Sequence, residues 1–209
     1  MLFRFKRLAS TMLSTLLYIL FVVLSFLLGS LPFAVWLGRL ADADPRRVGD
    51  SNPGTTNAWK AGGWRLGLPV IVLDFAKGFL PVFLARWAWN WSGWPLVAVT
   101  VAPVLGHRFS PFLGGRGGKG MMSLLAVWAG LTLWQGPLII GSMLLLGTFG
   151  LRLRDGWTLG LALFALLPFL LAGIWGWEAL ALWAFSALMI WAGYRHTLLW
   201  PPFRGKSHG

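Results

Sequence analysis

The sequence predicts an all-α integral membrane protein with about seven transmembrane helices, several of them short, and with glycine-rich loops on the cytoplasmic side. Apolar residues make up 57% of the 209 residues and charged residues only 11%, whereas an ordinary soluble domain carries about 25% charged residues. The mean hydropathy is +0.69. Long apolar stretches also recur along the chain, separated by Gly, Pro and charge. These observations exclude a soluble globular enzyme and a disordered chain.

The apolar stretches predict one multi-pass membrane domain over residues 1–209, without a separate soluble domain. A straight span needs about 20 apolar residues. The first stretch is longer than that, and we expect it to break near Gly29-Ser30-Leu31-Pro32. The third, fourth and fifth stretches are short, so we expect them to be tilted, partly re-entrant or extended into their loops. The seven predicted spans cover residues 8–40, 66–85, 94–106, 121–134, 138–151, 158–175 and 179–194.

The distribution of basic residues predicts the orientation in the membrane. Seven spans place the loops 39–65, 108–119 and 152–156 on one side, together with the tail after Tyr194. These segments hold most of the Lys and Arg residues, so the positive-inside rule makes their side cytoplasmic. Four tryptophans gather on the opposite side and are typical of an interfacial aromatic belt, namely Trp87, Trp89, Trp91 and Trp94.

The net charge of +12 indicates attraction to anionic membrane lipids or to an anionic substrate. The basic residues form no run and no single helix face, so nucleic acid is not an expected partner. The chain has no cysteine. This excludes a disulfide framework, thiolate metal sites and a cysteine nucleophile. Nothing in the sequence predicts the oligomeric state.

Residues 44–60 form the first polar loop of interest. Asn52-Pro53-Gly54-Thr55 has the Pro and Gly placement of a type II turn, and Thr55 or Thr56 is expected to cap a short helix through Trp59 and Lys60. A turn that leads into a helix start leaves amide N–H groups free, which favours anion binding. An ordinary polar connection is the alternative interpretation.

The second loop, residues 106–120, has five glycines within its last seven residues. Glycine lets backbone amides approach a ligand closely, and Arg116 and Lys119 add positive charge, so the loop predicts phosphate binding. A flexible hinge is the alternative. The loop is neither a dinucleotide-binding fingerprint, since no strand–helix unit surrounds it, nor a Walker A loop, since Leu113 and Gly120 occupy positions that the Walker pattern reserves for other residues.

Two charged residues, Asp74 and Lys77, fall inside the second apolar stretch. Each would cost about 2.5–3.5 kcal/mol at a lipid-facing helix centre, so we expect both to face the protein interior. Neither His107 nor His196 has a carboxylate at metal-ligand or catalytic-pair spacing, and no nucleophile elbow occurs. Any catalysis would therefore depend on positioning and on charge stabilisation.

Several motifs in sequence order resemble the bacterial acyl-phosphate:glycerol-3-phosphate acyltransferases of the PlsY type. They are residues 29–33, the loop 49–60, Asp74-x-x-Lys77-Gly78 and the segment 106–120, with Arg195-His196 near the end. The resemblance implies a seven-helix enzyme of the cytoplasmic membrane whose active site faces the cytoplasm. It would move an acyl group from acyl phosphate to the 1-hydroxyl of sn-glycerol 3-phosphate, giving lysophosphatidic acid and phosphate in phospholipid biosynthesis.

The same resemblance assigns roles to individual residues, with no metal and no cofactor. Catalytic positions would be Asp50, Ser51, Lys60, His107, Lys119 and His196. Substrate would be bound by Asn52, Gly54, Thr56, Asn57, Asp74, Lys77, Gly115, Arg116, Gly117, Gly118 and Gly120. We expect these segments to meet at the cytoplasmic end of the bundle, where they would form one cationic cup for two phosphorylated molecules.

The chain departs from the family pattern at several positions. Asp50 stands where the family has Ser, Lys60 where it has Arg, and Leu199 where it has Asn. Two alternatives therefore stay open. One is a divergent homologue that is inactive or uses another acceptor. The other is a small anion transporter, which would use the intramembrane charges Asp74 and Lys77.

Overall fold

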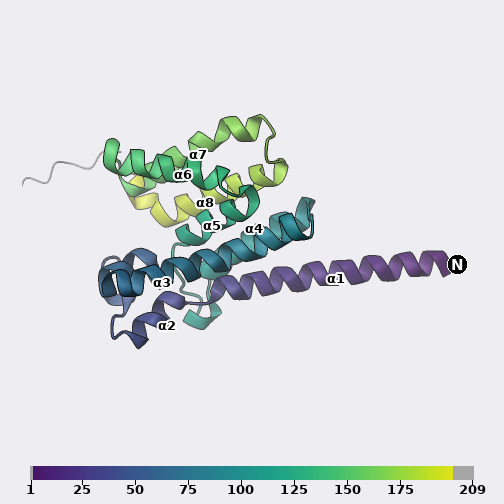
Figure 1. The fold of residues 1–209 in the computed structure, drawn as a ribbon, viewed down its shortest axis with the longest axis horizontal. Coiled ribbons are helices and arrows are strands. Elements are labelled where there is room, and N and C mark those ends of the chain that lie inside the picture. Colours follow the sequence, from purple (N-terminus) through teal and green to yellow (C-terminus); the bar gives the residue numbers. More distant parts are fainter. Residues whose placement is uncertain (1, 200–209) are drawn as a thin grey trace, which may run out of the picture.

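The computed structural model describes residues 2–199, with side chains from residue 11 onward, and this part of the chain is almost entirely helical (Figure 1). The helices are α1 (Leu2–Ser30), α2 (Phe33–Leu40), α3 (Thr55–Phe83), α4 (Gly93–Arg108), α5 (Met121–Thr132), α6 (Gln135–Leu145), α7 (Asp155–Leu171) and α8 (Trp177–Leu198). Short π-helical turns extend α3 to Ala88 and α6 to Gly150. Single 3₁₀ turns at Pro45–Arg47 and Pro111–Leu113 lie in the two polar loops.

The helices form two layers with α5 between them (Figure 1). One layer contains α1, α3 and α4, and the other contains α6, α7 and α8. In the first layer α1 and α4 cross closely because both carry glycine at the contact. A Cβ on Gly106 would meet the Phe26 carbonyl oxygen, and a Cβ on Gly29 would meet the Pro103 carbonyl oxygen. Small residues allow membrane helices to approach in this way.

The predicted break in the first apolar stretch is confirmed. α1 ends at Ser30 and α2 begins at Phe33, because Pro32 has no N–H to continue the helical hydrogen-bond ladder. The break leaves backbone carbonyls without helical partners, and such groups are costly inside a membrane. Two side chains from other helices and loops satisfy them. The Ser110 hydroxyl donates to the Ser30 carbonyl at 2.6 Å, and the Lys77 ammonium donates to the Leu31 carbonyl at 2.8 Å.

The helix that contains the predicted second span, residues 66–85, begins before the span does. α3 begins at Thr55, and its first two turns carry the predicted short helix through Trp59 and Lys60. These turns are set off from the rest of α3 by Gly63, whose φ of 61° and ψ of −154° are not helical. A glycine adopts this conformation without steric cost, so α3 can change direction there.

Two details of the turn before α3 are also corrected. A type II turn needs positive φ at Gly54, but Gly54 has φ −125° and is itself the N-cap residue, without a side-chain cap. The Gly54 N–H donates to the Asn52 carbonyl at 2.8 Å, which closes a tighter three-residue turn around Pro53. The rigid ring of Pro53 is compatible with this tighter turn.

Three helical segments are long and apolar enough to cross a membrane by length and composition, Thr11–Leu40, Thr55–Ala88 and Gly93–Leu113. Three further apolar helices of the described part are shorter, Met121–Thr132, Gln135–Gly150 and Asp155–Leu171. The all-α class is thus confirmed, whereas the count of seven full spans stays a prediction. The basic tail from residue 200 onward lies outside the described residues.

Candidate active site

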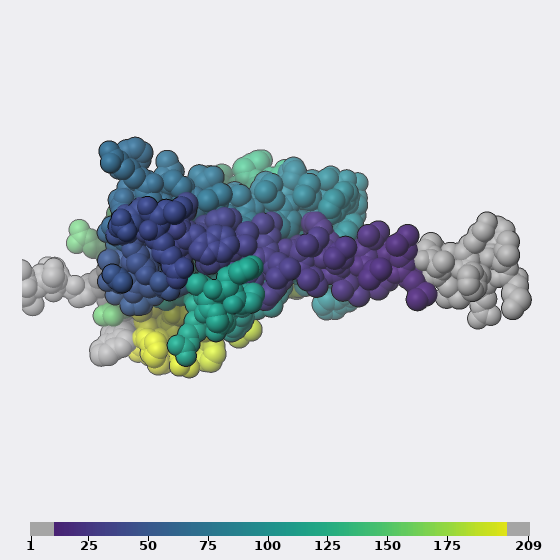
Figure 2. Space-filling view, turned by 90° about the horizontal axis from the view of Figure 1, so that it is seen from below, coloured from purple at the N-terminus to yellow at the C-terminus, as the bar shows by residue number. Residues whose placement is uncertain are grey.

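Three segments that are distant in sequence meet at one end of the bundle around Lys119. The Lys119 ammonium lies 2.8 Å from Asp50 Oδ2 in the loop before α3, and 4.5 Å from the centre of the Tyr194 ring on α8. The Lys119 backbone N–H donates to Asn52 Oδ1 at 3.1 Å. Figure 2 shows the teal segment around residue 110 beside the yellow end of α8. The predicted meeting of these segments is therefore confirmed.

Asn57 holds the loop before α3 in its conformation. Its side chain is only 2% exposed, and its Nδ2 group donates to Asp50 Oδ1 at 2.9 Å and to the Asn52 carbonyl at 3.0 Å. Since Asn57 lies in the first turn of α3, the helix start fixes both Asp50 and Asn52. Asn57 thereby acts on Lys119 through two residues that contact it directly.

A small polar cavity of about 60 Å³ lies behind this contact, between the loop residues and the helices. Asp74 and His107 are its most deeply buried polar residues, with exposed fractions of 1% and 8%. The cavity is lined by Asn52, Gly54, Thr55, Thr56, Asp74, His107, Lys119, Gly120, Met121, Met122 and Tyr194. The cavity thus brings the Lys119 ammonium, the Asp74 carboxylate and the His107 imidazole close to the N-terminus of α3.

The intramembrane charges Asp74 and Lys77 pair with each other inside the protein. The Lys77 ammonium lies 2.7 Å from Asp74 Oδ1, and both side chains are almost fully buried. The prediction that they face the interior is confirmed. Lys77 also lies 5.6 Å from the centre of the Phe33 ring. The pair therefore connects the polar cavity, through Asp74, with the break between α1 and α2, through Lys77.

The backbone N–H groups of residues 115–119, which we expect from the sequence to approach a ligand closely, have protein partners in this conformation. The Gly117 N–H donates to the Arg108 carbonyl at 2.9 Å, and the Gly118 N–H donates to the His107 carbonyl at 3.1 Å. Gly115 and Arg116 donate to the Ser110 and Leu113 carbonyls. The glycines serve instead to fold the loop back tightly against the end of α4. Lys119 follows this folded segment directly, and its own N–H donates to Asn52 Oδ1.

Several residues that the resemblance placed in the site lie outside the polar cavity. Ser51, Lys60, Gly115, Arg116 and His196 are exposed and do not line it. Lys60 lies near Gly49 on the outer face of the loop. On α8 it is Tyr194 that lines the cavity in place of His196. Sequence reasoning also did not single out Met121 and Met122, which follow the glycine loop directly.

Electrostatics keep the Asp50 carboxylate charged. Its pKa is lowered from the ordinary value of about 4, chiefly by the hydrogen bond with Lys119 and further by Asn57, against a smaller opposing effect of burial. Asp44, elsewhere in the same loop, has its pKa lowered to about 2 by the Arg46 guanidinium, with which it forms an ion pair at 2.7 Å. Each of the two carboxylates stays ionised and is balanced by a neighbouring cation. The remaining Lys and Arg residues give the loop a net positive charge.

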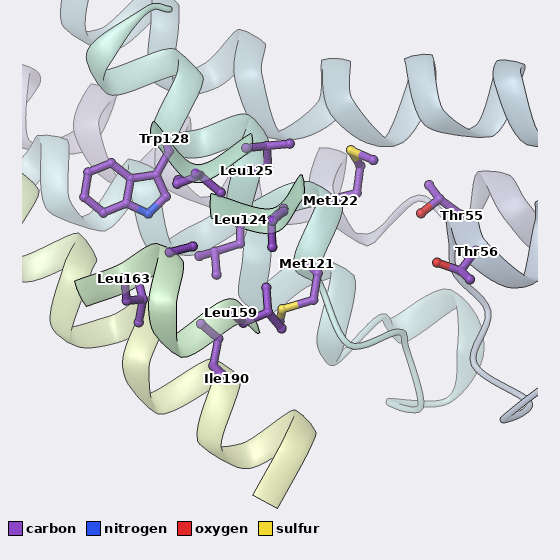
Figure 3. Close-up of a pocket in the computed structure, with 13 residues that line it drawn as sticks. Thr55, Thr56, Met121, Met122, Leu124, Leu125, Trp128, Leu159, Leu163 and Ile190 are labelled. Atoms are coloured by element: carbon purple, nitrogen blue, oxygen red, sulfur yellow. The ribbon is translucent and has the colours of Figure 1, made fainter. Parts of the chain in front are cut away.

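An apolar cavity of about 200 Å³ adjoins the polar one (Figure 3). The two share Thr55, Thr56, Met121 and Met122 in their linings. The remaining lining residues come from α5 to α8 and are Leu124, Leu125, Trp128, Ile140, Leu144, Leu159, Ala162, Leu163 and Ile190. The arrangement offers a charged compartment and an apolar compartment with a common boundary. Within residues 2–199, no group of three or more His, Cys, Asp or Glu side chains is placed to hold a metal ion.

Comparison with known proteins supplies relatives for this arrangement. Glycerol-3-phosphate acyltransferase 1 of Thermotoga maritima is 34% identical over 123 residues, which are 57% of this chain and 60% of the relative. The glycerol-3-phosphate acyltransferase of Leptospira borgpetersenii is 45% identical over 117 residues, which are 55% of this chain and 54% of the relative. The matches thus span somewhat more than half the length of these curated relatives.

Solved structures extend the likeness to most of the fold. The crystal structure of PlsY (YgiH), an integral membrane glycerol 3-phosphate acyltransferase, in its glycerol 3-phosphate form gives a TM-score of 0.77 at 28% identity and covers 87% of this chain and 90% of PlsY. The form with lysophosphatidic acid gives a TM-score of 0.76 at 27% identity. This likeness confirms an integral, multi-pass membrane protein. The family model for glycerol-3-phosphate acyltransferase matches residues 19–198, and the chain therefore belongs to the glycerol-3-phosphate acyltransferase family.

Proposed function

We propose that this chain transfers a fatty acyl group from acyl phosphate to the 1-hydroxyl of sn-glycerol 3-phosphate, which yields lysophosphatidic acid and phosphate for phospholipid biosynthesis. The observation that carries the proposal is the shared boundary between the polar and apolar cavities at Thr55, Thr56, Met121 and Met122. One substrate is small and anionic, and the other joins a phosphate to an acyl chain. The polar cavity suits the phosphate groups, and the apolar cavity suits the acyl chain.

In the proposed reaction the 1-hydroxyl oxygen attacks the acyl carbonyl carbon, and the bond between that carbon and the phosphate oxygen breaks. Lys119 neutralises phosphate charge, and His107 and Asp74 orient hydroxyl groups in the polar cavity. The hydroxyl proton passes to the departing phosphate, so the substrate itself acts as the base. An activity that followed a single histidine titration and vanished with His107→Gln at saturating substrate would contradict this route.

The donor is tested by assaying the purified protein with acyl phosphate, acyl-CoA and acyl carrier protein in parallel. We expect lysophosphatidic acid from acyl phosphate alone. Protein that binds acyl phosphate but gives no product with glycerol 3-phosphate would support the alternative of a divergent, inactive homologue. Uptake of labelled glycerol 3-phosphate into sealed vesicles without any acyl donor would support an anion transporter.

We further propose the cytoplasmic membrane as the location, with the active site on the cytoplasmic side. The loop residues around the site carry exposed cations such as Arg47 and Arg116, and the positive-inside rule places such loops in the cytoplasm. Because the chain has no cysteine, an Arg116→Cys variant gives a unique label site. A membrane-impermeant maleimide should label it in inverted vesicles, and labelling only in right-side-out vesicles would overturn the orientation.

The polar cavity holds only a few water molecules, which means that glycerol 3-phosphate needs more room than the described conformation provides. Lys119, which lines the cavity, is paired with Asp50, and the two side chains are partly exposed, at 33% and 51%. An ion pair this exposed contributes about 0–1 kcal/mol. We therefore propose that the substrate phosphate displaces Asp50 from Lys119.

We expect the Asp50→Asn variant to bind glycerol 3-phosphate up to about fivefold more tightly, because the competing ion pair is worth at most about 1 kcal/mol. Asn retains a partner for Asn57 but carries no charge. Titration calorimetry in detergent measures the change. In the unaltered chain Asp50 has a lowered pKa, so its carboxylate is ionised at neutral pH and the ion pair is intact. The ion pair is lost only as the pH falls through that lowered pKa. Weaker binding by Asp50→Asn would show that the carboxylate helps to hold the substrate.

A further inference from the structure

The apolar cavity extends from the boundary with the polar cavity into the helix bundle. Thr55 and Thr56 lie at the end next to the polar cavity, and Trp128 and Leu163 lie at the opposite end (Figure 3). Met121 and Leu124 line the stretch between them on α5 (Figure 3). An acyl chain whose carbonyl reacts at the polar end would therefore point its methyl end toward Trp128.

Trp128 is held rigidly from two sides. It is 1% exposed, and its indole N–H donates to the Ser186 hydroxyl of α8 at 3.2 Å. Ser186 in turn donates to the Leu182 carbonyl at 2.7 Å. The ring also packs against the start of α6, where a Cβ on Gly136 would lie 3.4 Å from it, and against the edge of the Trp175 ring. An indole fixed in this way cannot move aside for a longer chain.

We propose that Trp128 sets the length limit of the acyl chain that this protein accepts. The inference rests on the proposed acyl transfer and adds a specificity-determining residue to it. Each methylene that enters the apolar cavity contributes favourably by burial, until the chain reaches the indole. Beyond that point a further methylene has no room, and a well-packed wall penalises it. A pocket of this kind discriminates about 10–200-fold per methylene.

The test compares Trp128→Leu with the unaltered chain in a mixture of saturated acyl phosphates that differ by two carbons. The products are measured together by mass spectrometry, so the folded fraction of each preparation cancels. We expect the longest accepted chain to grow by at least two carbons. The first chain beyond the original limit should gain about tenfold or more relative to the preferred chain. An unchanged product profile would overturn the proposal.

A second variant changes the cavity in the opposite direction. Ala162, which is buried and lines the cavity, is replaced by Leu, and the preferred chain should become shorter. The matched control is Trp87→Leu. Trp87 likewise donates its indole N–H to another helix, in its case to the Gly130 carbonyl of α5, but it lines neither cavity. Its product profile should equal that of the unaltered chain, and the same shift in this control would assign the effect to general loosening of the bundle.

Binding of alkyl phosphates of the same chain lengths, measured by titration calorimetry, separates this inference from the proposed reaction. If the unaltered chain forms no product from any donor but Trp128→Leu still extends the range of alkyl phosphates that bind, acyl transfer is wrong and the length limit stands. If product forms while Trp128→Leu and Ala162→Leu leave both profiles unchanged, the reaction stands and the length limit is wrong.

Discussion

The Lys119→Gln variant is expected to lose acyl transfer activity by about 10²–10³-fold, which is the usual cost of removing one group that stabilises developing charge in an active site. Among the described residues, Lys119 is the one Lys or Arg in the lining of the polar cavity, and its backbone and side chain are positioned by Asn52, Asp50 and Tyr194. Gln keeps most of the length of the side chain but carries no charge. Steady-state rates with acyl phosphate and glycerol 3-phosphate measure the effect.

Arg65→Gln is the control for this variant. Arg65 is an exposed cation near the start of α3 that does not line the cavity, so its loss changes the net charge of the protein equally. We expect its rate to stay within about twofold of the unaltered chain, because exposed charges at a distance are largely screened. Equal losses in the two variants would indicate that Lys119 acts only through the overall field of the protein.

Gly117→Ala is expected to lower activity by about 100-fold, although Gly117 does not line the cavity. A Cβ at this position would overlap the backbone carbonyl of His107 and crowd that of Arg108. The loop would have to give up the two hydrogen bonds that fold it against α4, and Lys119, two residues later, would move. A displacement of about 1 Å at a reacting group costs about that much in rate.

The control for Gly117→Ala is Gly141→Ala on α6, where an added Cβ meets nothing within 4 Å. Alanine favours the helix over glycine, so this variant should be as stable as the unaltered chain or slightly more stable, with unchanged activity. Thermal unfolding followed by circular dichroism verifies that both variants are folded. Full activity in Gly117→Ala would mean that the loop tolerates the shift and does not position Lys119.

The features predicted correctly from the sequence are those with a local physical cause. Pro32 lacks the N–H that a continuing helix would use, and it follows Gly29 and Ser30 closely, so the break was placed correctly, although four other prolines lie inside helices, namely Pro69, Pro81, Pro103 and Pro168. Charges inside an apolar helix are costly in lipid, so the burial of Asp74 and Lys77 followed from their position alone. The meeting of the two polar loops followed from the expected number of crossings and from the distribution of basic residues.

The features that the sequence did not indicate depend on how distant segments pack. The partners of the glycine-loop amides are carbonyls at the end of α4, and no spacing in the sequence indicates that the loop folds back onto them. The choice between Tyr194 and His196 depends on the rotation of α8, since residues two apart differ by about 200° around a helix axis. Trp128 was missed for a similar reason, because a tryptophan in an apolar stretch is not distinguished from its fourteen counterparts until the neighbouring helices are placed.

The interruption of the helix at Leu31 and Pro32 affects how the protein adapts to bilayers of different thickness. From Met12 to Leu27 many of the large side chains of α1 are exposed, and Figure 1 shows this helix extending well past its neighbours. A long apolar helix adapts to a thinner or thicker bilayer by tilting. Because Ser110 and Lys77 anchor the carbonyls at the interruption, we expect such tilting to stop there. The chemistry at Lys119 should then be insensitive to the lipid composition around α1.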